Sequence, residues 1–300
     1  MYVILGATGH TGSAIAENLL AKGEKVRVIG RNKERLAKLS DQGAEALVGD
    51  AADSTFLTQA FGGARAVYFM VPPNPASNDY RGFQTQVIDA GARALEAAGV
   101  HYAVALSSFG ADKESGSGPV SGLHELEVKF QRIPSLNAVF LRAGYFLENL
   151  IPQVSVIQNF GIMGGPVRPD LPLPMIATKD IGAAAAERLH KLDFSGHETR
   201  ELLGQRDITY TEAARILGEA IGKPDLAYVQ LPPDQFIQAL VQMGISNNFA
   251  SLIVEMAGAM NDGRMKALEP RSAANTTPTS FEEFVQKEFL PAYRGKAVTA

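Results

Sequence analysis

The chain opens with a short apolar strand that runs directly into three evenly spaced glycines. Residues 3–12 read Val-Ile-Leu-Gly-Ala-Thr-Gly-His-Thr-Gly. Gly6 permits a tight turn, Gly9 lets the main chain approach phosphate groups, and Gly12 lets the next helix pack close to its strand. Apolar residues at helical spacing follow, so a helix is expected from about His10, with its free N–H groups and positive dipole end facing an anion. The pattern predicts a dinucleotide site, with a plain strand–turn–helix as the alternative. The predicted cofactor loop comprises Gly6, Thr8, Gly9, His10, Thr11 and Gly12.

Composition excludes several classes of protein. The 300 residues are 46% apolar and carry a net charge of only −4, which indicates a sizeable core and neither a nucleic-acid nor a membrane surface. Cysteine is absent, so disulfides, thiol catalysis and thiolate metal sites are excluded, and no metal site is expected. No apolar run approaches the roughly 20 residues of a membrane span. Because the first strand begins at once, we expect no signal peptide and a cytoplasmic protein.

The first half alternates strands and helices. Strands are expected at 2–5, 25–30, 45–49, 64–71, 102–107 and 137–142, with helices at 10–22, 32–39, 53–61, 80–98 and 123–132. This rhythm implies parallel strands joined by right-handed crossovers. The predicted fold class is therefore α/β, a doubly wound parallel sheet of the Rossmann type, over residues 1–150.

The second half has a different character. Residues 161–174 are rich in glycine and proline and are expected to form a loop that acts as a lid. A helix is expected at 178–192 and a strand at 200–204, so that parts of 175–205 complete the sheet. Helices follow at 209–221, 233–243, 248–261 and 281–289. Residues 151–300 are thus predicted to form a smaller, mainly helical lobe for a substrate or a partner.

The end of the second expected strand indicates which dinucleotide binds. An NAD site usually has an acidic residue there, whereas this chain has Arg31, followed by Asn32 and, three residues later, Arg35. A guanidinium can bind a 2′-phosphate bidentately, and an acid would repel it. We therefore predict NADP(H), with Arg31, Asn32 and Arg35 at the phosphate; the alternative is a solvated helix start.

Two further strand ends are expected to touch the cofactor. Asp50 and Ala51 follow the third strand, where an adenine would lie, although Asp50 could equally cap the helix near Asp53. Val71, Pro72 and Pro73 end the fourth strand with a stiff exit suited to lie along a ribose. A rigid loop is the other interpretation.

With these motifs together, the chain resembles the NmrA-like branch of the atypical short-chain dehydrogenases. Residues 141–149, Leu-Arg-Ala-Gly-Tyr-Phe-Leu-Glu-Asn, resemble that family's Arg-x-x-x-Phe-x-Glu-Asn stretch, and residues 178–182, Thr-Lys-Asp-Ile-Gly, are similar to its closing motif. The resemblance covers about residues 1–220. It implies a Rossmann fold and NADP(H). Tyr145 and Phe146 lie where an aromatic wall beside the nicotinamide is expected, although they could simply fill core space. Family members include quinone reductases, azo and triphenylmethane dye reductases, and redox-sensing regulators.

The usual catalytic pair of short-chain dehydrogenases is missing. None of the eight tyrosines has a lysine four residues later, so ordinary alcohol–ketone chemistry is not expected. His124 is the best remaining proton donor, because imidazole titrates near neutral pH, but it could be an idle surface histidine. Ser107 could bond the substrate or the nicotinamide amide, or merely cap a loop. An apolar pocket could be lined by Phe109, Phe160, Met163 and Met175, or these residues could simply pack.

Two functions remain open at this level. One is a reductase that transfers hydride from NADPH to a small quinone-like or azo aromatic substrate, which the expected lid favours. The other is a non-catalytic NADP(H)-binding redox sensor, which the missing acid favours. A homodimer or a regulatory protein partner is left open, and no direct contact with nucleic acid is expected.

Overall fold

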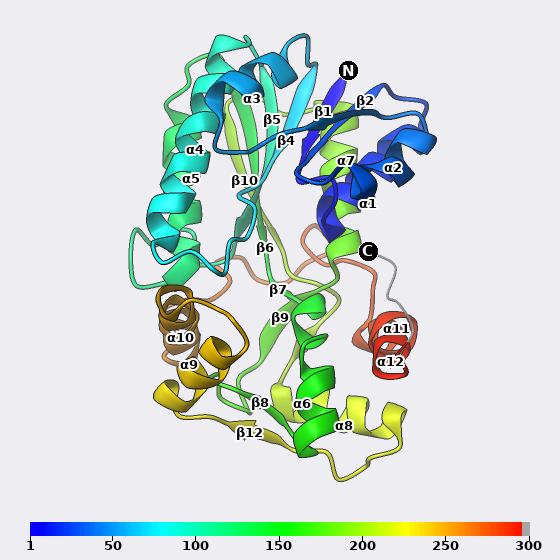
Figure 1. The fold of residues 1–300 in the computed structure, drawn as a ribbon, viewed down its shortest axis with the longest axis vertical. Helices are drawn as coiled ribbons and strands as arrows, with labels where there is room; N and C mark the ends of the chain where they lie inside the picture. The colour runs from blue at the N-terminus through cyan, green and yellow to red at the C-terminus, as the bar shows by residue number, and fades with distance from the viewer. Residues whose placement is uncertain (296–300) are drawn as a thin grey trace.

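The computed structural model describes residues 1–295, and its largest element is a seven-stranded parallel sheet (Figure 1). The strands lie in the order β10-β6-β5-β4-β1-β2-β3. Their bounds are β1 Tyr2–Leu5, β2 Val26–Gly30, β3 Glu45–Val48, β4 Ala66–Phe69, β5 Tyr102–Ser108, β6 Asn137–Ala143 and β10 His197–Leu202. The predicted doubly wound sheet is confirmed, and the strand expected at 200–204 is β10, which pairs with β6.

Helices cover both faces of this sheet, which explains why its strands are apolar on both sides. Their bounds are α1 His10–Ala21, α2 Lys33–Asp41, α3 Ser54–Phe61, α4 Tyr80–Ala97, α5 Ser121–Gln131 and α7 Thr178–Lys191. In β1, Tyr2 and Ile4 pack into one core cluster together with α1, α2 and α7, whereas Val3 and Leu5 pack into the other with α3, α4 and α5. Figure 1 shows α4 and α5 on one side of the sheet and α1, α2 and α7 on the other.

The strand order reverses between β1 and β4, so the sheet has its switch point there. β1 pairs with β2 on one side and with β4 on the other, both in parallel. The chain proceeds outward to β3 first and then crosses to β4, β5 and β6. In sheets of this kind, ligands bind beyond the carboxyl ends of the strands at the switch point.

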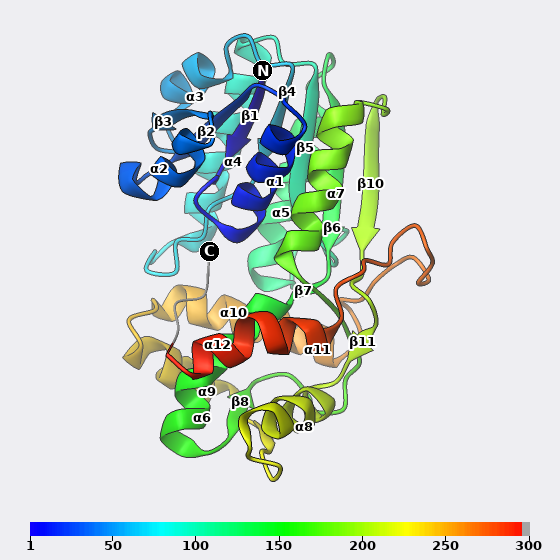
Figure 2. The ribbon, with the colours of Figure 1, turned by 90° about the vertical axis from the view of Figure 1, so that its right-hand side faces the viewer.

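A second, smaller group of elements lies below those carboxyl ends (Figures 1 and 2). It contains two small sheets, of order β11-β9-β7 and β12-β8, besides its helices. The strands are β7 Tyr145–Phe146, β8 Met163–Gly165, β9 Leu173–Ile176, β11 Asp207–Ile208 and β12 Tyr228–Gln230. The helices are α6 Gln153–Phe160, α8 Tyr210–Ile221, α9 Pro233–Gln242, α10 Asn247–Asn261, α11 Phe281–Phe284 and α12 Leu290–Tyr293, with short turns η1 Gly118–Val120, η2 Leu147–Leu150 and η3 Val285–Phe289. The last five residues of the predicted lobe, 296–300, lie outside the described part of the chain.

The expectation of a loop over residues 161–174 is wrong for 163–165 and 173–174, which form strands, and right for 166–172. Met163–Gly165 forms β8, which pairs in parallel with β12, and Leu173–Ile176 forms β9 between β7 and β11. The pairing partner of β8 lies more than sixty residues later in the chain, and glycine and proline composition gives no information about such long-range pairing. The segment is therefore part of the lobe's two small sheets.

Candidate functional site

The glycine loop has the geometry that a phosphate site requires. Gly6 has φ of +73°, which favours glycine, and a Cβ on Gly12 would lie 2.4 Å from the Gly6 carbonyl oxygen. Gly9 is the N-cap of α1, and no side chain caps this helix. The first N–H groups of α1 are therefore left for a ligand. Gly6, Gly9, His10 and Thr11 line a cavity of about 490 Å³.

The three residues predicted to bind a 2′-phosphate have different roles in the structure. Arg31 is exposed directly after β2 and makes no ion pair within residues 1–295. Asn32 caps α2, since its side chain accepts a hydrogen bond from the Arg35 N–H at 2.9 Å. The Arg35 guanidinium donates to the Thr8 carbonyl oxygen at 2.9 Å and so braces the glycine loop. Of these two guanidinium groups, only that of Arg35 is engaged by another group within residues 1–295.

The other two strand ends also differ from each other. Asp53, and not Asp50, caps α3, while one Asp50 oxygen accepts a hydrogen bond from the Ala52 N–H at 2.9 Å. Ala51 is buried in the core under the sheet. After β4, Val71 and Pro73 line the cavity, and Pro72 lies between them in the chain.

The cavity extends from the glycine loop to a wall of methionines in the lobe. Its far side is lined by Met256, Met260, Met265 and Phe109, so this end is strongly apolar. Of the other predicted pocket residues, Met163 and Met175 are buried in the lobe core, and Phe160 is 74% exposed. Phe109 thus lines the pocket, Met163 and Met175 pack in the core as the alternative interpretation had it, and the exposed Phe160 fits neither interpretation. Residues 161–174 form no part of the wall, so the expected lid is absent from the described structure.

Helix α10, which carries Met256 and Met260, is fixed to the segment after β4. The Ser246 N–H donates to the Pro75 carbonyl oxygen at 2.9 Å, and the Ser246 hydroxyl donates to the Ser77 carbonyl oxygen at 2.6 Å. The rings of Phe249 and Tyr80 lie 4.4 Å apart, and Tyr80 lines the cavity. Burial raises the pKa of Tyr80 to about 12, so its phenol stays neutral at ordinary pH.

Ser107 lines the cavity but is held by a buried ion pair. Its hydroxyl donates to Glu127 Oε1 at 2.6 Å, and Arg142 donates to both Glu127 oxygens, at 2.9 and 2.6 Å. Glu127 is 3% exposed. The sequence indicates that Glu127 is buried, because helical spacing places it on the apolar face of α5 with Leu126 and Phe130.

His124 is half-buried on α5, and its Nδ1 lies 2.9 Å from the Ala111 carbonyl oxygen. Within the described residues, its neighbour Leu123 lines the cavity and His124 does not. The predicted proton-donor role stays a prediction to which this placement adds no support.

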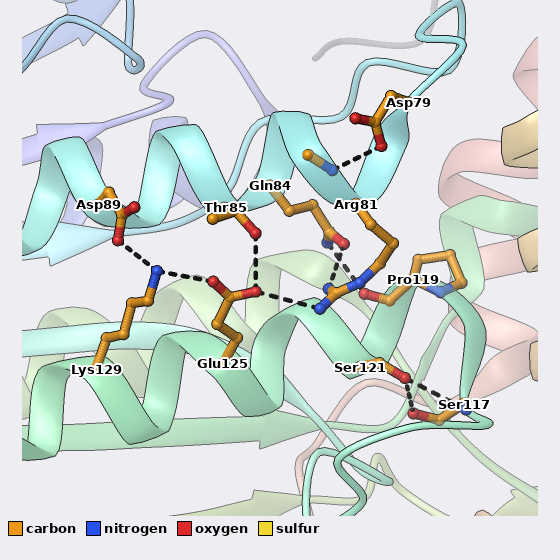
Figure 3. A network of polar contacts seen from close by, with 11 residues as sticks. Asp79, Arg81, Gln84, Thr85, Asp89, Ser117, Pro119, Ser121, Glu125 and Lys129 are labelled. Atoms are coloured by element: carbon orange, nitrogen blue, oxygen red, sulfur yellow. Dashed lines mark hydrogen bonds and ion pairs between the residues drawn. The ribbon is translucent and has the colours of Figure 1, made fainter.

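A polar network that sequence reasoning missed lies between α4 and α5 (Figure 3). Gln84 lines the cavity, donates to the Pro119 carbonyl oxygen at 3.0 Å and accepts from Arg81 at 2.9 Å. Arg81 also pairs with Glu125 at 3.2 Å. A Cβ on Gly122 in α5 would lie 2.2 Å from both Arg81 and Gln84, so a larger residue would not fit there. In the sequence, a glycine inside this helix was the sign that side chains of another element approach it closely.

Tyr145 and Phe146 form β7 and line the cavity, as does Glu148 in the turn that follows. Glu148 accepts hydrogen bonds from the main-chain N–H and the hydroxyl of Thr178, at the start of α7. A Cβ on Gly182 would lie 2.5 Å from the Ala14 side chain, so this glycine lets α7 pack closely against α1. The stretches 141–149 and 178–182 thus meet at one edge of the cavity.

Within residues 1–295 there is no group of three or more His, Asp or Glu side chains placed to hold a metal ion. None of the helices described is both long and apolar enough to span a bilayer.

Comparison with known proteins places this architecture among reductases and a regulator. The Escherichia coli NADPH-dependent quinone oxidoreductase QOR2, complexed with NADPH, is 25% identical with a TM-score of 0.78, covering 95% of this chain and 99% of that one. The Citrobacter triphenylmethane reductase complexed with NADP(H) is 22% identical, also with a TM-score of 0.78 and the same coverage, and supports the fold. The nitrogen metabolite regulation-like protein bik4 of Gibberella fujikuroi is 24% identical over 97% of each chain.

The family model for the NmrA-like family matches residues 2–285. The match spans the glycine loop, the stretches 141–149 and 178–182, and the lobe up to the first residue of η3. This chain belongs to the NmrA-like family.

Proposed function

We propose that this protein is an NADPH-dependent reductase that transfers hydride to a small quinone-like or azo aromatic acceptor. The observation that carries the proposal is the single cavity that runs from the glycine loop to the apolar wall of α10. One end suits a pyrophosphate and the other a flat apolar molecule, so the cavity can hold a coenzyme and an acceptor in contact. The quinone oxidoreductase QOR2, with which this chain shares 25% identity, supports the same chemistry.

The residues present fit NADP(H). The loop at Gly6, Gly9 and Gly12 leaves a cradle that a Cβ would fill, and the uncapped end of α1 points its N–H groups at it. Arg31 is exposed where a 2′-phosphate would lie. Tyr145 and Phe146 would lie beside the nicotinamide.

The chain's own contribution to the reaction is positioning and exclusion of water. When bound, the dihydronicotinamide supplies a hydride. The methionine wall and Phe109 hold the acceptor in an apolar space, and Gln84 is fixed at its edge by Arg81. No Tyr-x-x-x-Lys pair is present in the sequence, and within the described residues His124 does not line the cavity, so we assign the proton that completes the reduced acceptor to solvent.

The test is steady-state oxidation of NADPH with a panel of quinones, azo dyes and triarylmethyl dyes. We expect turnover with at least one aromatic acceptor and much weaker activity with NADH. Background rates with every acceptor, in a protein that still binds NADPH tightly, would exclude the reductase. That outcome would favour a redox sensor, the alternative supported by the similarity to the nitrogen metabolite regulation-like protein.

Gly9→Ala separates cofactor binding from folding. A Cβ at Gly9 would meet the Gly6 carbonyl oxygen at 3.4 Å, an ordinary contact, and the residue's φ of −96° is open to alanine. The methyl group would stand where the phosphates approach. Loss of one charge-assisted hydrogen bond weakens NADPH binding about 10- to 150-fold.

The measurements are calorimetric NADPH affinity and the thermal midpoint of the free protein. Gly9→Ala should lower only the affinity. Gly12→Ala, whose Cβ would lie 2.4 Å from backbone, should lower both. An unchanged NADPH affinity in Gly9→Ala would show that the phosphates bind elsewhere.

A further inference from the structure

Tyr145 is held at the cavity wall by a close backbone contact. A Cβ on the preceding residue, Gly144, would lie 2.3 Å from the Pro174 carbonyl oxygen. This approach lets β7 pair in parallel with β9, with Tyr145 opposite Met175. The ring position is therefore fixed by main-chain pairing and not by a mobile loop.

Two further tyrosines back this ring. The ring of Tyr210 meets that of Tyr145 nearly edge-on, at 6.3 Å and 73°, and the ring of Tyr228 stacks on that of Tyr210 at 4.4 Å and 20°. The Tyr228 hydroxyl donates to the Val167 carbonyl oxygen at 2.9 Å. The stack joins β7, α8 and β12, so it locks Tyr145 against rotation away from the cavity.

The proton of the Tyr145 hydroxyl is uncommitted. The Tyr210 and Asn149 side chains lie near its oxygen. Among residues 1–295 no acceptor takes the Tyr145 O–H, in contrast to the hydroxyls of Tyr228 and Tyr68. Since Tyr145 lines the cavity, its O–H is available to a molecule bound there.

The environment keeps this phenol neutral. Burial raises the pKa of Tyr145, and the nearby polar groups of Tyr210 and Asn149 only partly offset that increase. A phenol with a raised pKa does not readily transfer its proton. Its neutral O–H is nevertheless a good hydrogen-bond donor toward a developing anion.

We propose that the Tyr145 hydroxyl is the catalytic hydrogen-bond donor to the acceptor atom that gains negative charge as hydride arrives. This inference rests on the proposed reductase function. When bound in the cradle of the glycine loop, NADPH would supply the hydride with its electron pair and would leave as NADP⁺. A quinone acceptor gains that hydride and becomes an oxyanion, and an azo acceptor becomes a nitrogen anion. Tyr145 keeps its O–H bond and stabilises the anion, which then takes a proton from solvent water.

The test compares acceptors that do and do not become anions. Tyr145→Phe keeps the ring and removes the hydroxyl, so kcat for quinones should fall on the order of 100-fold. A triarylmethyl dye is a carbon cation that hydride neutralises, so no anion forms on it. The kcat of Tyr145→Phe with such a dye should therefore differ from the wild-type kcat by less than about 2-fold. The control, Tyr228→Phe, removes a hydroxyl already bonded to Val167 and should leave both rates near those of the wild type. NADPH affinity and the thermal midpoint of Tyr145→Phe should match the wild type.

Equal losses with both kinds of acceptor, or no loss with quinones, would overturn the inference while leaving the reductase function intact. A second measurement does not need turnover: 4-nitrophenolate, an anionic probe detected by its absorbance, is titrated into the protein with NADP⁺. Wild-type protein should bind the phenolate about 10- to 150-fold more tightly than Tyr145→Phe. Equal affinities would contradict a donor role for Tyr145, even if no acceptor is reduced.

Discussion

Replacing Arg31 with aspartate is expected to reverse the coenzyme preference from NADPH to NADH. The guanidinium is exposed at the end of β2, while its neighbour Arg35 is already bonded to the Thr8 carbonyl. Losing one charge-assisted hydrogen bond costs about 10- to 150-fold in NADPH affinity, and a carboxylate there bonds the free ribose hydroxyls of NADH. If the gain in NADH affinity is as large as the loss in NADPH affinity, the ratio of the two dissociation constants changes on the order of 10²- to 10⁴-fold.

Calorimetric titration of both coenzymes measures this ratio. Arg35→Met is the matched control, because it loosens the glycine loop and should weaken NADPH and NADH alike. An unchanged ratio in Arg31→Asp would mean that the 2′-phosphate does not lie at the end of β2.

Removing the Glu127 carboxylate is expected to cause the largest loss of stability. Glu127→Ala leaves Arg142 without its bidentate partner and Ser107 without its acceptor, in a site where the Arg142 side chain is only 12% exposed. Breaking a buried ion pair in this way costs about 3–5 kcal/mol. Urea denaturation of the wild type and the variant measures the change in the free energy of unfolding.

Two controls make this result interpretable. Glu125→Ala removes a carboxylate from the more exposed network on the same helix, and about 1 kcal/mol or less is expected. The double variant Glu127→Leu with Arg142→Met replaces both charges by apolar groups and should recover most of the loss. A small effect of Glu127→Ala alone would show that Arg142 can reach water without its partner.

Much of the Rossmann part was predictable because its signals are local. Apolar strands, the glycines at 6, 9 and 12, and helical spacing all lie within a few residues of the elements they specify. The cap of α3 shows the limit, since Asp50 and Asp53 both suit the position and only the backbone geometry selects Asp53. The sheets of the lobe depend on partners far along the chain, such as β8 and β12.

The residues of the candidate site that belong to a short sequence motif were predictable, and the residues positioned by tertiary packing were not. The cofactor loop and Tyr145 follow from short patterns. The direction of His124, toward the Ala111 carbonyl and not the cavity, depends on how α5 is rotated against the sheet. The links from Arg81 on α4 to Glu125 on α5 and from Glu127 on α5 to Arg142 on β6 join residues on neighbouring elements, and in the sequence only Gly122 and the apolar spacing around Glu127 indicated them.

The methionines at the far end of the cavity have a consequence for the range of acceptors. Met256 and Met260 lie on α10, and Met265 follows shortly after it. Unbranched thioether side chains rotate readily and remain polarisable against aromatic rings. Such a surface can reshape itself around planar molecules of unequal size while the pyrophosphate cradle, built from main chain, stays rigid. In the proposed reductase, a broad range of acceptors and a strict choice of coenzyme would then depend on separate parts of the chain.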